Sequence, residues 1–405
     1  MMNLEGPNVH QRRLLYLDWL KVLAVLGVFF AHSIDMLDLV DWHTRYQEHA
    51  VGIMIFTSFG SQWGMALMFL LAGATAQFAL GSRNGAQFIN ERVKRLLIPS
   101  IFGILLLSPI EAYFDALRRL VYDNSFFQFV PHFFASIHIG GDFRWLASFG
   151  YHLWFLVFLF LISLLSLPLL ILLRRKQGLR LIHWLAAIST PPGGLLLLAI
   201  PFILVQVFLK APFPGYQNWA DCFSWLLSFW YGYILLADAR FEQAIRSQRR
   251  FTLLAASACL LLLVGLYMMG YIQSWEARPD FSIGYICYQL LRGLLNWSLL
   301  AFILYFAMRF LDAGNRLLSY MNEAALPFYI LHYPVVVITA FYIESWSDNP
   351  LLRFLLISTM ALILTLALYE LLVRRIPLMR LLFGMKPPKY EDDIKPLVLR
   401  HAHRP

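Results

Sequence analysis

Long apolar runs alternate with short polar segments along the whole chain. A helix needs about 20 mostly apolar residues to cross a membrane. Ten stretches of that kind lie at 14–33, 53–81, 96–114, 152–173, 193–210, 219–237, 251–271, 284–308, 324–343 and 351–373. The division between the fifth and the sixth is the weakest, and the second is over-long, with Gly60, Gln62 and Gly64 where it could break or tilt. The pattern predicts an all-α fold, a polytopic transmembrane helical bundle of about ten spans.

Basic residues gather in every second loop between these stretches. Lys and Arg precede the first stretch and follow the second, fourth, sixth, eighth and tenth, whereas the other loops are mostly acidic or mixed. Because cytoplasmic loops carry an excess of Lys and Arg, both the N and the C terminus are expected to be cytoplasmic. The outer loop at 115–150 is the exception, since it carries Arg118, Arg119 and Arg144. Its many phenylalanines suggest a partly helical cap on the outer membrane face.

The composition agrees with a membrane protein. Of the 405 residues, 60% are hydrophobic and 14% are charged, whereas a soluble domain is about half apolar and about a quarter charged. The net charge of +9 comes from loop clusters, so membrane lipid is an expected partner and nucleic acid is not. The three cysteines form no C-x-x-C pair, and neither a disulfide framework nor a metal site is expected.

The chain divides simply. We expect a cytoplasmic N-terminal segment at 1–13, one membrane domain at 14–385 and a cytoplasmic tail at 386–405. The first span is expected to be retained, because no small-residue cleavage signature follows it. The tail is charged and carries two prolines, so it is expected to be poorly ordered.

Ionisable residues inside spans are costly and by default mark function. The first span holds Asp18, Lys21 and His32. At about 100° per residue, Lys21 and His32 share one helical face to within about 20°, and the helix rise separates them by about 16 Å. That spacing suits a long ligand or a tunnel with a cation at its inner end and a histidine at its outer end. The alternative is an interfacial Asp18–Lys21 pair and a histidine that merely ends the helix.

Other spans also carry polar residues. Arg292 must face a partner such as Glu111, water or an anionic ligand. Glu370 is expected to neutralise Lys21 or Arg95, and His332 to be packed and hydrogen-bonded between two prolines that can free backbone carbonyls. The full set comprises Glu111 in the third span, His152 and Trp154 at the start of the fourth, Gln289, Arg292 and Asn296 in the eighth, His332 in the ninth and Glu370 in the tenth.

The first span resembles the opening of acyltransferase family 3, the integral-membrane acyltransferases that modify sugars and other envelope molecules. That family begins with L-D-x-L-R, ten residues and a histidine; this chain has Leu17-Asp18-Trp19-Leu20-Lys21, ten residues and His32. Lys21 keeps the charge of the usual arginine but loses its bidentate fork. Segments that resemble further family motifs follow in the family's order: Met65–Gly73 (with Ala72 in place of a serine), Glu91–Pro99, His152–Leu156 and Pro327–Pro334.

The resemblance implies an enzyme that transfers an acyl group other than an amino-acyl group. The donor would be cytoplasmic acyl-CoA, a co-substrate with no bound cofactor, and the acceptor a hydroxyl of a carbohydrate or another envelope molecule. The location would be the bacterial cytoplasmic (inner) membrane, and the chain also resembles the branch that succinylates periplasmic glucans. His32 would be the catalytic base, since histidine can deprotonate a hydroxyl or briefly carry an acyl group near neutral pH.

Other residues are expected to support this chemistry. Lys21, Arg92 and Arg95 would bind the donor phosphates, although Arg92 and Arg95 could equally be ordinary inside-positive anchors. The second ring nitrogen of His32 would be oriented by Asp35, Glu111 or His152. The supporting residues would be Asp18, Glu111, His152, Trp154, Arg292 and His332, with Trp154 lining or packing a tunnel rather than reacting.

Two other classes of protein compete with this interpretation. A transporter or flippase of a lipid-linked or sugar substrate should have pseudo-symmetric halves, but the intramembrane charges cluster at the start of this chain without a second copy. A non-catalytic scaffold would explain the topology but not Lys21, His32 and Arg292 together.

Overall fold

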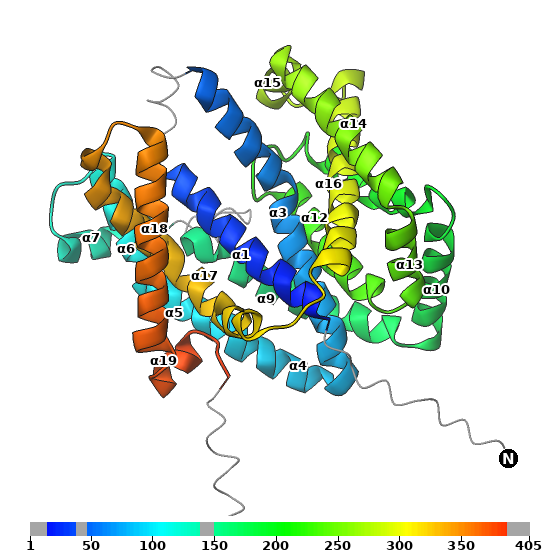
Figure 1. The fold of residues 1–405 in the computed structure, drawn as a ribbon, viewed down its shortest axis with the longest axis horizontal. Helices are drawn as coiled ribbons and strands as arrows, with labels where there is room; N and C mark the ends of the chain where they lie inside the picture. Colours follow the sequence, from blue (N-terminus) through cyan, green and yellow to red (C-terminus); the bar gives the residue numbers. More distant parts are fainter. Residues whose placement is uncertain (1–13, 38–46, 138–149, 387–405) are drawn as a thin grey trace, which may run out of the picture.

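The computed structural model describes residues 14–37, 47–137 and 150–386, and helices are the only regular secondary structure within them. All ten apolar stretches coincide with helices, and the predicted all-α polytopic bundle is confirmed (Figure 1). Within the described residues, seven helices are long and apolar enough to cross a membrane, or eight if one bent pair is a single span. These seven lie at α1 (Leu15–Asp35), the part Trp63–Ser82 of α3 (Gln47–Ser82), α9 (Trp154–Leu173), α14 (Arg249–Met268), α16 (Ile283–Phe310), α17 (Arg316–Ile343) and α18 (Pro350–Leu368).

The third apolar stretch lies within the bent pair. This pair runs through α4 (Gly85–Arg92), a π-helical turn η1 (Val93–Leu97), α5 (Ile98–Leu106) and α6 (Ser108–Arg118), with a bend of 40° before α6. Proline lies in the first turn of both α5 and α6. Because proline lacks an N–H, each is tolerated at a helix start but interrupts a continuous helix.

The fifth and sixth stretches form shorter helices. A 3₁₀ segment, η3 (Gly194–Ala199), leads into α11 (Ile200–Leu209), and α12 (Trp219–Leu235) follows. The number of true spans and the side of each terminus therefore stay predictions. The second stretch does not break at Gly60–Gly64, since α3 is one continuous helix.

Short helices connect the longer ones. One of them, α7 (Phe126–Ala135), lies in the loop expected to form a helical cap, whereas Arg144 and the two chain ends lie outside the described residues. The others are η2 (Tyr151–Leu153), α10 (Lys176–Ser189), α13 (Ala239–Ser247), α15 (Tyr271–Ala277), η4 (Glu344–Trp346), η5 (Tyr369–Val373) and α19 (Pro377–Leu382).

Two glycines let α3 and α12 pack with their backbones in contact. A Cβ atom on Gly73 would lie 1.8 Å from the carbonyl oxygen of Phe229, and one on Gly232 would lie 1.8 Å from that of Leu70. Small residues at a helix crossing allow this close approach in membrane proteins. The contact fixes the stacked rings of Phe69 on α3 and Trp225 on α12, whose centroids are 5.4 Å apart.

The helix α17 is the centre of the bundle, and α1, α6 and α18 pack against it. A side-chain amide joins α1 to α17: Asn322 Nδ2 donates to Asp18 Oδ1 at 2.7 Å, and Lys21 Nζ donates to Asn322 Oδ1 at 2.9 Å. Figure 1 shows α1 running from the lower part of the molecule to its upper left, so its two ends reach different regions. This packing positions the site described next.

Candidate active site

Three histidines from distant parts of the sequence converge at the C-terminal end of α1. The ring centroids of His32 and His332 are 5.6 Å apart, and those of His152 and His332 are 5.4 Å apart. His152 (η2) and His332 (α17) are buried, whereas 27% of the His32 side chain is exposed. The three residues, called the histidine cluster below, therefore form a buried site that reaches the surface through His32.

Backbone carbonyls of α17 fix two of these rings. His152 Nε2 lies 3.1 Å from the carbonyl oxygen of Ile330, which is free to accept because Pro334, four residues later, has no N–H. His332 Nδ1 lies 2.6 Å from the carbonyl oxygen of Tyr329. With a donated N–H on one nitrogen, the other nitrogen of a neutral imidazole carries a lone pair. Among the described residues, His332 Nε2 has no hydrogen-bond partner.

Glu111 brings a buried carboxyl group to the cluster. Its Oε1 lies 2.9 Å from His152 Nδ1, and both side chains are almost fully buried. The contact does not meet the geometry of a hydrogen bond, and within the described part of the chain both carboxyl oxygens lack a hydrogen-bond partner. Because a buried carboxylate without a donor is costly, one shared proton at this contact would satisfy both groups.

His32 is oriented by Asp35. Its Nδ1 lies 3.3 Å from Asp35 Oδ2, one turn later in α1, and its ring contacts Tyr333 edge-on at 4.6 Å. Of the three orienting residues considered from the sequence, the structure places Asp35 against the ring. With an N–H directed at the carboxylate, Nε2 of His32 is the nitrogen that can accept a proton.

The expected sharing of one helical face by Lys21 and His32 is visible in their contacts. Lys21 reaches Asn322 and His32 reaches His332, and both partners belong to α17. Asn322, which binds Asp18 and Lys21, was not among the residues singled out from the sequence. It lies next to Glu323, just before the ninth apolar stretch, where a polar residue is ordinary.

Arg92 and Arg95 make contacts different from those of Lys21. The Arg92 guanidinium lies over the Phe88 ring at 4.7 Å, and its Nε has no hydrogen-bond partner among the described residues. Arg95 lies 3.7 Å from Glu91 and donates to the carbonyl oxygen of Gly384 at 3.4 Å. In Figure 1, α4, α19 and the beginning of α1 all lie in the lower part of the molecule. Lys21 thus contacts α17, whereas Arg92 and Arg95 contact residues of α4 and Gly384.

The expected partner of Glu370 needs correction, and one of the alternatives for Arg292 is wrong. Glu370 pairs with Arg374 at 2.8 Å and accepts from the Tyr320 hydroxyl at 3.2 Å, rather than neutralising Lys21 or Arg95. A carboxylate one turn from an arginine on the same helix is the nearer partner.

Arg292 does not pair with Glu111, which lies beside His152. Its Nη1 donates to Gln289 Oε1 at 3.4 Å, and its guanidinium lies 5.3 Å from the Tyr288 ring centre.

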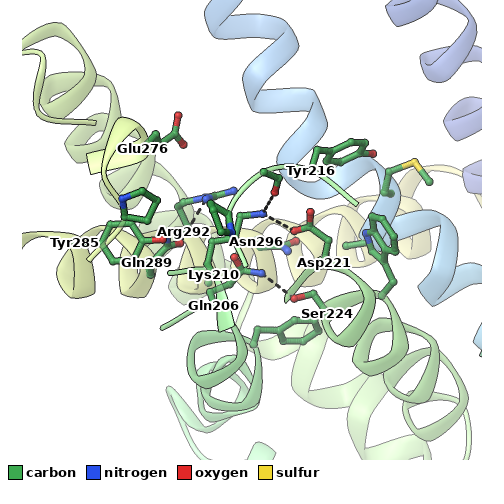
Figure 2. A pocket seen from close by; sticks show the side chains of 18 residues that line it. Gln206, Lys210, Tyr216, Asp221, Ser224, Glu276, Tyr285, Gln289, Arg292 and Asn296 are labelled. Atoms are coloured by element: carbon green, nitrogen blue, oxygen red, sulfur yellow. Dashed lines mark hydrogen bonds and ion pairs between the residues drawn. The ribbon is translucent and has the colours of Figure 1, made fainter. Parts of the chain in front are cut away.

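Trp154 packs against aromatic rings of a second region of the protein. It follows His152 by two residues, and its ring centre lies 4.9 Å from that of Trp225 and 6.0 Å from that of Tyr216. Both of these residues line a cavity that also contains Arg292 (Figure 2). The expectation that Trp154 lines or packs a substrate tunnel, rather than reacting, stays a prediction.

Comparison with known proteins gives the class. A family model described as an acyltransferase domain matches residues 14–370, nearly the whole chain. The chain therefore belongs to this acyltransferase family, and its apolar helices make it an integral membrane protein. None of the curated proteins and none of the solved structures compared with it matches.

Proposed function

We propose that this membrane acyltransferase moves an acyl group from cytoplasmic acyl-CoA to a hydroxyl of a carbohydrate or another envelope acceptor, in the bacterial inner membrane. The observation that carries the proposal is the environment of His32. Of the three clustered histidines, it alone combines a carboxylate partner with a side chain that reaches the surface. A general base needs both an orienting group and access to its substrate.

The proposed reaction is a direct transfer. Nε2 of His32 accepts the proton of the acceptor hydroxyl while the oxygen attacks the thioester carbonyl. The new C–O bond forms as the C–S bond breaks, and the proton passes from the imidazolium to the leaving thiolate. The contact of Asp35 with Nδ1 stabilises the imidazolium. The His332 ring, stacked at 5.6 Å, restricts the orientation of the His32 ring.

The donor would extend along the inner half of α1. Lys21, Arg92 and Arg95 are proposed to bind its phosphates, because cations favour phosphate through charge-assisted hydrogen bonds. The helix rise separates Lys21 from His32 by about 16 Å. A pantetheine arm is the extended part of the donor that would cover this distance.

The test compares His32→Ala with His183→Ala, an exposed histidine on α10 whose side chain is 61% exposed. Loss of a general base should lower turnover by roughly 10²–10⁴-fold, whereas His183→Ala should leave it unchanged. Acyl-CoA binding to His32→Ala should stay close to wild type, and Lys21→Ala should weaken donor binding more than turnover. Near-normal transfer by folded His32→Ala would remove His32 from the mechanism.

A further inference from the structure

A polar cavity of about 320 Å³ lies between α11, α12 and the first half of α16 (Figure 2). Small-molecule pockets occupy roughly 300–1,000 Å³, so the cavity is large enough for one compact ligand unit. The connections beside it, at 210–219 and 271–283, are outer loops in the topology that the charge pattern predicts. The cavity would therefore open on the same side of the membrane as His32.

The formal charges around the cavity cancel. Lys210 and Arg292 line it together with Asp221 and Glu276. Lys210 is committed to the protein, because its Nζ lies 3.0 Å from Asp221 Oδ1 and 2.5 Å from the carbonyl oxygen of Gly215. A site for a phosphate or carboxylate would keep an excess of positive charge. This balance favours a ligand without net charge.

Amide side chains supply the hydrogen-bonding capacity. Gln206 and Asn296 both line the cavity, and among the described residues Gln206 Oε1 and Asn296 Oδ1 are buried without a hydrogen-bond partner. Gln206 is held by its other end, since its Nε2 donates to Ser224 Oγ at 2.9 Å. A buried acceptor without a donor costs free energy, and a ligand hydroxyl is a donor that would satisfy it.

Aromatic rings complete the wall and pack against Trp154. Trp225 and Tyr216 line the cavity, and both pack against Trp154, which lies two residues after His152. Aromatic faces combined with amides suit a ligand that has apolar C–H faces as well as hydroxyl groups.

We propose that this cavity binds a neutral, polyhydroxylated unit of the acyl acceptor, such as one sugar residue, and so holds the acceptor beside the histidine cluster. The inference rests on the proposed function, because it names the acceptor class of the same reaction. The proposed ligand is a neutral carbohydrate. Preferential binding of an acidic sugar, or a cavity that binds no sugar, would contradict the proposal.

The test measures binding separately from catalysis. Wild-type protein in lipid nanodiscs is mixed, without acyl-CoA, with a panel of neutral oligosaccharides of glucose, galactose, mannose and N-acetylglucosamine. Binding is followed by saturation-transfer difference NMR, with oligogalacturonate as the acidic comparison. At least one neutral oligosaccharide should bind, and the acidic one should bind more weakly.

Two variants of α16 locate the binding. Asn296→Leu removes an amide from the cavity wall with little change of shape, and it should weaken binding about three- to tenfold, the effect of one hydrogen bond to a neutral group. Ser298→Ala is the matched control, since its hydroxyl is also buried without a partner among the described residues but does not line the cavity. Gln206→Met should act in the same direction as Asn296→Leu.

The outcomes separate this inference from the proposed function. Failure of every neutral sugar to bind, stronger binding of the acidic one, or an equal effect of the two α16 variants would overturn the cavity assignment while leaving His32 catalysis standing. Binding that depends on Asn296, in a protein that consumes no acyl-CoA with any bound sugar, would keep the binding site and overturn the acyl transfer. In active protein, Asn296→Leu should raise the acceptor KM and leave the acyl-CoA KM unchanged.

Discussion

Replacing Gly232 by alanine should destabilise the bundle at the crossing of α3 and α12. The added Cβ would lie 1.8 Å from the backbone oxygen of Leu70, whereas ordinary contacts begin at 3.4 Å. The two helices would therefore have to separate by about 1.6 Å, the difference between these distances. Overpacking costs about 1–3 kcal/mol. We expect a loss near 3 kcal/mol in the free energy of unfolding, because a backbone atom cannot rotate away.

The same separation should reduce activity. Phe69 and Trp225 stack across this crossing, and Trp225 also packs on Trp154 beside the histidine cluster. A misplacement of about 1 Å can cost roughly 10²-fold in rate. Turnover of Gly232→Ala should therefore fall by one to two orders of magnitude even at temperatures where the protein remains folded.

The assay is equilibrium unfolding in mixed micelles with a rising fraction of SDS, followed by circular dichroism, with turnover measured on the same samples. Gly265→Ala on α14 is the control, because a Cβ there would meet nothing within 4 Å. It should leave the unfolding free energy unchanged or raise it by up to about 1 kcal/mol, since alanine favours helix. Wild-type stability of Gly232→Ala would show that the backbones do not touch at this crossing.

Two further predictions concern the contact between α1 and α17 and the C terminus. Asn322→Leu should lower the unfolding free energy by about 1–3 kcal/mol, because it removes the hydrogen bonds to Asp18 and Lys21; it should also raise the KM for acyl-CoA, and a KM equal to wild type would separate Lys21 from donor binding. A reporter that is active only in the periplasm should be inactive when fused after Lys386, and its activity there would contradict the cytoplasmic C terminus.

Local sequence information was sufficient for the helices. Each apolar stretch coincides with a helix because hydropathy over about 20 residues is a property of that segment alone. The bend between α5 and α6 is also local, because Pro109 in the first turn of α6 interrupts the helix before it. An apolar run, however, does not reveal the angle of the bend. The fifth and sixth stretches, predicted at 193–210 and 219–237, also match their helices at both ends, since η3 and α11 cover 194–209 and α12 covers 219–235.

The candidate site depended on contacts across the chain. The periodicity of α1 placed Lys21 and His32 on one face, and both residues do face α17. No local pattern could show that His332, 300 residues later, stacks on His32. The partner of Glu370 was missed because a tertiary contact was preferred over Arg374 on the next turn.

Pro334 affects which ring nitrogens in the histidine cluster carry a hydrogen. By releasing the Ile330 carbonyl it commits the single N–H of neutral His152 to the backbone, and the Tyr329 carbonyl does the same for His332. Asp35 engages the N–H of His32 in the same way. The lone pair of His152 Nδ1 then faces Glu111, where the shared proton satisfies it, whereas His332 Nε2 meets no hydrogen-bond donor among the described residues. An alcohol bound at His32 would bring a hydrogen close to that acceptor.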